Sequence, residues 1–275
     1  MHRFLRLSEQ AGIKLPSFPL VLLVCAFAAC DLLTDSGSSD LTLDYPNVLP
    51  ADDSDVSDSL RKMYRKDAAR LALRKVNEAG GTASQEVELP QDLVSTLYYA
   101  LIHVHNATHL ASRDSVVVIY AIHTFPYPEI YSLIVGVDST SKWVAAWRRG
   151  ERFTGNQQVD ALMKEFDLQL DRYYDWPGSH AVTLRATRPL NIAALAGRFD
   201  GIDAVSYAEP NGTIGDGNDI TARSEASYWQ FDYSVGYGDC PSGCIGRHFW
   251  TFQIYSDGHV EYAGSSGNPA PAPKG

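Results

Sequence analysis

The sequence has few cysteines and no long apolar run. Only four of its 275 residues are cysteine, and its longest apolar stretch, residues 20–29 ahead of Cys30, is ten residues long. A helix of this length covers about half of the roughly 30 Å hydrocarbon core of a bilayer, so it does not predict a membrane span. Glycine patterns of phosphate- and dinucleotide-binding loops and the Gly-x-Ser-x-Gly motif are also missing. We therefore predict no cofactor, no catalytic residue and no enzymatic activity.

The sequence also has fewer basic than acidic residues. Lys and Arg number 23 against 33 Asp and Glu, which gives a formal net charge of −10. Nucleic acids and anionic lipid headgroups are bound by clustered Lys and Arg, so this composition argues against both as partners. Hydrophobic residues make up 45% of the chain, which is enough for a packed core.

Residues 1–29 have the layout of an export signal. Arg3, Arg6 and Lys14 precede the apolar run, and small residues close it. The closing sequence Phe-Ala-Ala-Cys, residues 27–30, resembles the lipobox of bacterial lipoproteins. This resemblance implies that the leader is removed and that Cys30 receives fatty acyl chains such as palmitate. Two or three acyl chains anchor a protein firmly to a membrane, here on the extracytoplasmic side of the bacterial cell envelope.

Plain secretion is the alternative to lipid anchoring. The lipobox usually has Leu where this sequence has Phe27, and Ala26-Phe27-Ala28 also fits an ordinary A-x-A cleavage site. The other cysteine of this region, Cys25, follows the bulky Val24 and is expected to be lost with the leader. We keep Cys30 as the predicted lipidation site and the membrane as the predicted partner.

The remaining sequence predicts an α+β fold. Residues 30–57 are polar and acidic and indicate a flexible spacer, and residues 58–211 are predicted to form an α+β body with a helical N-terminal part. Helices are predicted where apolar residues recur three to four apart: 58–79, 91–105, 142–149 and 157–166. Buried strands are predicted from β-branched runs: 115–122 and 131–137.

Residues 180–209 predict a strand, a ten-residue helix and a second strand joined by short links. Such a crossover unit places its two strands parallel in one sheet, so we expect a mixed sheet with a ferredoxin-like βαβ unit. The unit ends in Ala208-Glu209-Pro210-Asn211. Over residues 180–211 it resembles the second half of the propeptide and inhibitor domains of subtilisin-like proteases, which implies inhibition of such proteases.

Residues 212–264 predict a three-stranded antiparallel meander. Aromatic and polar residues alternate in 228–237 and 247–255, and Asp257-Gly258 predicts a hairpin turn because both residues tolerate positive φ. Residues 238–264 resemble the C-terminal region of uncharacterised bacterial secreted proteins, a resemblance that implies no function. Residues 265–275 contain no core-forming side chain and are expected to be disordered.

Cys240 and Cys244 remain with Cys30 once the leader is removed. An even pair in an exported protein predicts a disulfide, which stabilises a fold by roughly 2 kcal/mol when it closes a loop of about five residues. Zinc is the alternative, with Asp239 and His248 as further ligands. Zinc sites favour a second Cys pair, which this sequence lacks, so we predict no metal site.

Three further patterns are candidates for ligand binding. His105 and His109 have the spacing of a helical zinc motif, but no Glu follows His105 as general base. Residues 215–219 (Gly-Asp-Gly-Asn-Asp) offer oxygen ligands without the regular spacing of a calcium loop. Aromatic residues could line a carbohydrate or peptide groove, although core packing is their commoner role: Trp143, Trp147, Tyr173, Tyr174, Trp176, Trp229 and Trp250.

Together these patterns favour an exported, membrane-anchored lipoprotein with a non-catalytic binding or structural role. A protease inhibitor, based on residues 180–211, is the alternative from a different class. A metallohydrolase, based on the histidines, is the third hypothesis. Inhibition assays with subtilisin-like proteases and elemental analysis for zinc discriminate between them.

Overall fold

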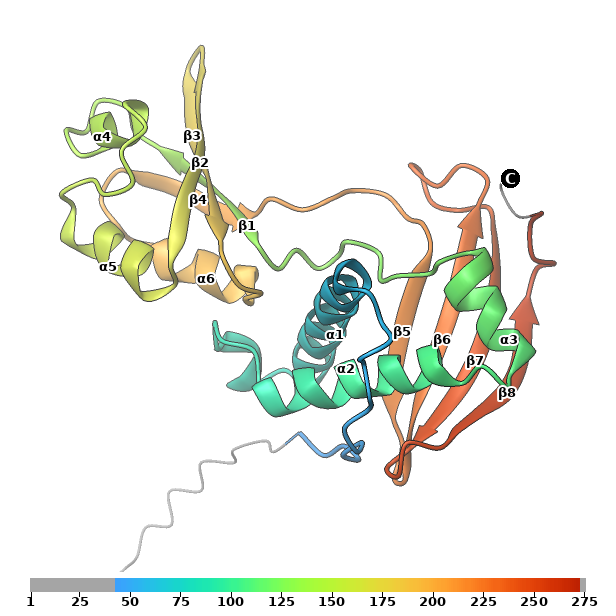
Figure 1. Cartoon of the computed structure of the whole chain (residues 1–275). Coiled ribbons are helices and arrows are strands. Elements are labelled where there is room, and N and C mark those ends of the chain that lie inside the picture. Colours follow the sequence, from blue (N-terminus) through green and yellow to red (C-terminus); the bar gives the residue numbers. More distant parts are fainter. Residues whose placement is uncertain (1–42, 273–275) are drawn as a thin grey trace, which may run out of the picture. The chain divides into compact units, whose positions relative to one another are not determined.

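The computed structural model describes residues 43–272. It contains helices and two four-stranded antiparallel sheets (Figure 1), which confirms the predicted α+β class. No helix in the described part of the chain is long and apolar enough to cross a membrane. The leader and Cys30 lie outside the described residues, so the roles assigned to them stay predictions.

The first sheet has the strand order β2-β3-β1-β4. Its strands are β1 (Ser132–Val137), β2 (Leu168–Trp176), β3 (Ser179–Ala186) and β4 (Val205–Pro210). Both β3 and β4 pair antiparallel with β1, so they run parallel to each other, as the crossover predicts. The predicted mixed sheet is wrong, because β1 lies between them and every neighbouring pair is antiparallel.

Three helices pack against one face of this sheet (Figure 1): α4 (Val144–Arg148), α5 (Gln157–Glu165) and α6 (Ile192–Phe199). Asn156 and Asn191 cap α5 and α6, since each side chain accepts hydrogen bonds from backbone N–H groups of the first turn. Trp147, Met163 and Phe199 are fully buried between the helices and the strands. This sheet therefore has a hydrophobic core of its own, which we call the first core.

The second sheet is a meander of four sequential strands, where three were predicted. Its strands are β5 (Asp219–Ser224), β6 (Tyr228–Tyr237), β7 (Gly246–Tyr255) and β8 (Val260–Gly267). The additional strand β5 buries only Ile220 fully, so it lacks the alternating apolar pattern that reveals a strand. The predicted turn at Asp257-Gly258 is present, with Gly258 at φ +87°.

Helices α1 (Asp58–Ala79) and α2 (Gln91–Asn106) match their predicted bounds closely. Ser57 caps α1 by accepting from Leu60 N at 3.3 Å, and Gly80 ends it at φ +67°. A 3₁₀ turn, η1 (Ala83–Gln85), lies between the two helices. Their apolar faces pack with each other and with the aromatic face of the second sheet, and we call this the second core (Figure 1).

The predicted boundary between residues 58–211 and 212–264 does not follow these two cores. Helices α1 and α2 share the second core with β5–β8, whereas residues 132–210 build the first core. An amphipathic helix pattern identifies which face of a helix is buried, but it carries no information on which sheet that face covers.

Residues 115–119 are helical and residues 120–122 have no regular secondary structure, so the strand predicted over 115–122 is wrong. A short helix, α3 (Ala111–Asp114), continues into a π-helical turn, η2 (Ser115–Ile119). Val116 is buried in the second core, but Val118 and Ile119 are 62% and 51% exposed. A short apolar run does not by itself distinguish a buried strand from a helical segment, and here only one side chain of the turn is fully buried.

Two segments predicted to be disordered are packed where the structure describes them. In the expected spacer, Val48 and Val56 are buried, and Pro46 O accepts from Trp229 Nε1 at 2.8 Å. In the expected tail, β8 runs to Gly267 and hydrogen bonds hold residues 268–271. The expectation of disorder is wrong for residues 43–57 and 265–272. Both segments are polar, and composition alone does not show that their backbone groups form hydrogen bonds with the rest of the chain. The rest of both segments lies outside the described residues.

Arg74 of α1 joins three segments of the chain. Its guanidinium donates to the Asp219 carboxylate at 3.0 Å and to the carbonyl oxygens of Phe125, Tyr127 and Ile220. Asp219 also accepts from Phe125 N at 2.7 Å. Burial raises the pKa of Asp219 above its ordinary value although Arg74 acts in the opposite direction. The carboxylate has therefore lost much of its hydration and depends on Arg74 for its charge.

We expect Arg74→Met to lower the free energy of unfolding by about 3 kcal/mol, because it leaves the Asp219 charge part-buried without its partner. Arg74→Met/Asp219→Leu should be less destabilised, since it also removes that charge. Urea denaturation followed by circular dichroism measures both. The control is Arg198→Met at an exposed position of α6, which should change stability by less than about 0.5 kcal/mol. An Arg74 variant as stable as this control would contradict the assignment.

Candidate functional site

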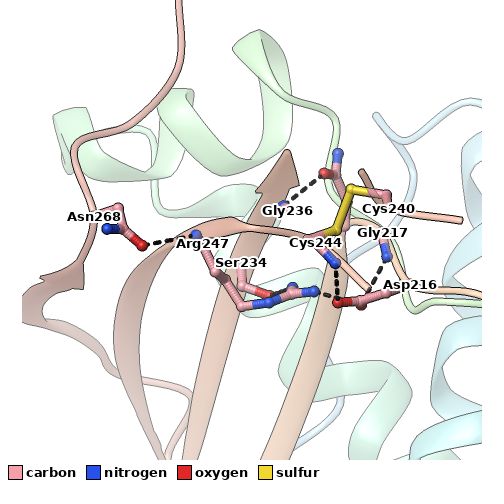
Figure 2. The surroundings of a disulfide bond; sticks show 9 residues. Asp216, Gly217, Ser234, Gly236, Cys240, Cys244, Arg247 and Asn268 are labelled. Atoms are coloured by element: carbon pink, nitrogen blue, oxygen red, sulfur yellow. Dashed lines mark hydrogen bonds and ion pairs between the residues drawn. A yellow bond between two sulfur atoms is a disulfide. The ribbon is translucent and has the colours of Figure 1, made fainter. Parts of the chain in front are cut away.

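Cys240 and Cys244 lie in the connection between β6 and β7, and their sulfur atoms are at disulfide distance, 2.18 Å apart (Figure 2). Backbone hydrogen bonds tie this turn to the loop before β5. The Cys240 carbonyl accepts from Asp216 N at 2.9 Å, and the Asp216 carboxylate accepts from Cys244 N at 3.2 Å. The disulfide therefore closes a turn that also holds the entry to the second sheet.

The two carboxylates of residues 215–219, the loop whose spacing did not favour calcium, are both paired with arginines. Arg247 of β7 donates from Nη2 to Asp216 at 2.5 Å and from Nη1 to Ser234 Oγ at 2.7 Å (Figure 2). The hydrogen bond from Arg247 holds the pKa of Asp216 below its ordinary value. Asp219 is engaged by Arg74. Cationic side chains therefore occupy the charge-compensating position that calcium would take in this loop.

The alternative zinc ligands do not converge. The sulfur atoms of Cys240 and Cys244 face each other, and His248 Nδ1 lies 2.6 Å from the Asn268 carbonyl oxygen. His105, from the helical histidine pair, has its Nδ1 at 3.1 Å from the Tyr64 hydroxyl. Within residues 43–272, no group of three or more His, Cys, Asp or Glu side chains is arranged to hold a metal ion.

Most of the candidate aromatic residues belong to the cores. Five of the seven pack in or against them: Trp143, Trp147, Tyr173, Trp229 and Trp250. Trp176, at the end of β2, is 47% exposed and stacks on Tyr174 with ring centroids 4.7 Å apart. Core packing, the role expected to be the commoner one, therefore holds for these five, and the seven residues do not assemble the alternative aromatic groove.

A hollow of about 570 Å³ lies between α1, the start of α2 and the residues that follow β3. Its walls include two arginines, one glutamate and two tyrosines: Arg65, Glu88, Tyr98, Tyr99 and Arg188. A second hollow of about 480 Å³ is lined by the next residue of α1, Lys66, together with Tyr131 and Arg185. Both volumes lie within the range of small-molecule sites, about 300–1,000 Å³. Adjacent residues of α1, Arg65 and Lys66, line the two hollows, and we refer to both hollows together as the cleft.

Three cations line these two hollows without a carboxylate partner. Among the described residues, Arg65, Lys66 and Arg185 make no ion pair within 4.0 Å, whereas Arg188 is paired with Glu88. Arg65 lies 5.1 Å from the centre of the Tyr98 ring, and Lys66 lies 5.8 Å from the centre of the Tyr131 ring. Such contacts orient a cation over a ring without neutralising it, so the positive charge stays available to a ligand.

Two tyrosines of the cleft, Tyr98 and Tyr131, have a raised pKa. Burial and a hydrogen bond to Asp53 raise the pKa of Tyr98 to about 12. Burial also raises the pKa of Tyr131, and the Glu129 charge acts in the same direction. Tyr98 and Tyr131 therefore present neutral phenol rings beside the cationic side chains of Arg65 and Lys66.

The residues of the cleft form no motif, and sequence reasoning missed them. Arg65 and Lys66 read as the polar face of an amphipathic helix, and Arg185 reads as an outward position of a strand. One local signal was available: residues 61–66 contain four bases in a chain of net charge −10. Their association with residues 185–189 arises only in the folded chain.

Comparisons with protein-family models, with curated proteins and with solved structures found no match. The class of protein therefore follows from the fold and the site alone. It is an α+β protein with two separate sheets, a disulfide-closed turn in the second sheet and a cationic cleft beside α1.

We expect Cys240→Ser/Cys244→Ser to lower the free energy of unfolding by about 2 kcal/mol, because the unfolded chain gains the freedom of the opened five-residue loop. The circular dichroism spectrum at low denaturant should stay unchanged, since the turn contributes no core residue. Urea unfolding measures the change. Ser242→Ala alters the same turn without opening it and serves as the control; equal stability of the two variants would refute a role for the bond.

Proposed function

We propose that this protein is an exported, lipid-anchored binding protein that holds a small anionic ligand in the cleft beside α1. One observation carries the proposal. Arg65, Lys66 and Arg185 lie without carboxylate partners in two hollows of a chain whose net charge is −10. Unpaired cations in a concave site with low-dielectric walls concentrate field lines and attract carboxylate or phosphate groups.

The side chains of the cleft favour an organic anion over a bare inorganic ion. Arg65 and Arg185 present planar guanidinium groups, which bind carboxylate and phosphate through paired hydrogen bonds. Tyr98, Tyr99 and Tyr131 add flat apolar faces that carry hydroxyl groups. These features support a ligand in which carboxylate or phosphate groups flank an apolar or ring-shaped part.

Binding without catalysis is the role that these groups support. Glu88, the carboxylate in the wall of the larger hollow, is engaged by Arg188. Tyr98 remains protonated well above neutral pH. The cations of the cleft are thus arranged to hold negative charge, while Glu88 is paired with Arg188 and Tyr98 keeps its proton.

The anchoring part of the proposal is supported by the basic leader and by residues 27–30. Acyl chains on Cys30 would hold the cleft at a membrane surface outside the cytosol. The disulfide distance between Cys240 and Cys244 supports the same compartment, since disulfides persist in oxidising environments such as the bacterial periplasm and cell surface.

Citrate and pyrophosphate, titrated by calorimetry at low salt, serve as probes of the cleft. We expect binding of at least one of them, and we expect Arg65→Ala/Arg185→Ala to weaken it at least tenfold, because charge-assisted hydrogen bonds contribute about 1.5–3 kcal/mol each. Arg198→Ala, which removes an exposed cation elsewhere, is the matched control and should bind as the parent does. Lack of binding by both probes, or equal losses in both variants, would count against the cleft.

Mass spectrometry of the protein recovered from bacterial membranes tests the anchor. We expect a mature chain that begins at Cys30 and carries two or three acyl chains, and we expect Cys30→Ser to abolish both the added mass and the membrane association. An unacylated start, or a chain that retains residues 1–29, would overturn the anchoring proposal while leaving the cleft proposal standing.

A further inference from the structure

Asn268 continues the hydrogen bonding of β8 beyond the end of the strand. Its backbone N–H donates to the Arg247 carbonyl at 2.8 Å, and its side-chain oxygen accepts from Arg247 N at 3.1 Å (Figure 2). His248 Nδ1 lies 2.6 Å from the Asn268 carbonyl oxygen. These contacts bring the chain to the end of the second sheet that carries the disulfide.

Beyond Asn268, two tyrosine hydroxyls hold the chain by its carbonyl groups. Tyr237, at the end of β6, donates to Pro269 O at 2.9 Å. Tyr120, directly after the π-helical turn, donates to Pro271 O at 2.5 Å. The Tyr120 ring packs on Trp250 with ring centroids 5.3 Å apart. Two tyrosine hydroxyls thus donate hydrogen bonds to the carbonyl oxygens of two prolines that are two residues apart.

The two tyrosines line a hollow of about 440 Å³ next to the disulfide. Ile119 and Cys240 form part of its wall, together with Pro271 itself. Ile119 is 51% exposed, so apolar surface remains beside the segment for a longer peptide to cover. The hollow is separate in sequence and in lining from the cationic cleft.

This arrangement has the chemistry by which proteins recognise proline-rich peptides. Proline has no N–H, so its carbonyl oxygen is its remaining backbone hydrogen-bonding group. Its fixed φ favours the extended polyproline II conformation, which aromatic grooves bind at a low entropic cost. Residues 268–272, Asn-Pro-Ala-Pro-Ala, have the composition of such a ligand.

The segment beyond Asn268 is held by hydrogen bonds and is not buried in a core. Pro269 and Ala270 are exposed, Pro271 is half-buried, and none of the three belongs to a hydrophobic core. Hydrogen bonds that replace bonds to water contribute little net free energy. The two tyrosine contacts therefore position the segment without locking it.

We propose that Tyr120 and Tyr237 form a binding site for proline-rich peptide segments and that residues 269–272 occupy this site in cis. A proline- and alanine-rich segment of a partner protein binds there by displacing them. Because a tethered ligand competes at a high effective concentration, the protein's own C-terminal segment lowers the affinity for the partner. The site is thus regulated by a competitor that the chain itself supplies.

The test uses a fluorescently labelled peptide with the sequence of residues 265–272 and a truncated chain that ends at Asn268, so that all strands and the Asn268 contacts remain. Fluorescence anisotropy should show that the truncated chain binds the peptide about tenfold more tightly than the full chain. Circular dichroism verifies that the truncated chain is folded. A peptide in which Ala replaces both prolines should not bind.

Tyr120→Phe/Tyr237→Phe, introduced in the truncated chain, should weaken peptide binding about tenfold, because both hydroxyl donors are lost. Tyr207→Phe, at an exposed position of β4, is the matched control and should leave binding unchanged. The proposal fails if the truncated chain does not bind the peptide, if the hydroxyls make no difference, or if full and truncated chains bind equally. Full-chain dimers that truncation dissolves would instead make a second copy the occupant.

Discussion

The ion pair between Arg74 and Asp219 is the contact on which the arrangement of this molecule depends. Arg74 shares one face of α1 with Asp67 and Arg70, since residues three and four apart on a helix are neighbours. Thr124 Oγ1 donates to Asp67 at 2.7 Å and accepts from Arg70 Nη1 at 2.8 Å. These three side chains fix residues 123–128, the segment that leads from the helical part to β1, and with it the start of the first sheet.

The shape of the cleft depends on how residues 123–128 are held against α1. One wall belongs to α1, and the facing wall follows β3, which pairs with the β1 strand that residues 123–128 lead into. The charges of the cleft also show why composition describes only the average of a surface. An acidic chain is unsuited to the extended phosphate backbone of a nucleic acid, yet its surface contains two hollows lined by three cations without carboxylate partners.

Sequence reasoning succeeded where a pattern is local and repeats. The apolar spacing of α1 and α2 and the alternation in β6 and β7 predicted what the structure contains. It failed where tertiary contacts decide. The π-helical turn at 115–119 has the composition of a strand, and β5 has the composition of a loop. The cleft could not be predicted, because its arginines stand more than a hundred residues apart and gather only after folding.

The packed segment before α1 defines where the foldable unit begins. Val48 and Val56 cover the second core, and Leu49 N donates to the Ser256 carbonyl at the β7–β8 hairpin. A shortened chain that started at α1, where amphipathic periodicity first becomes visible, would uncover the indole of Trp229 and the apolar surface around it. Exposed aromatic surface of this kind promotes self-association. A truncated protein for crystallisation or binding experiments must therefore retain the acidic segment that begins at residue 43.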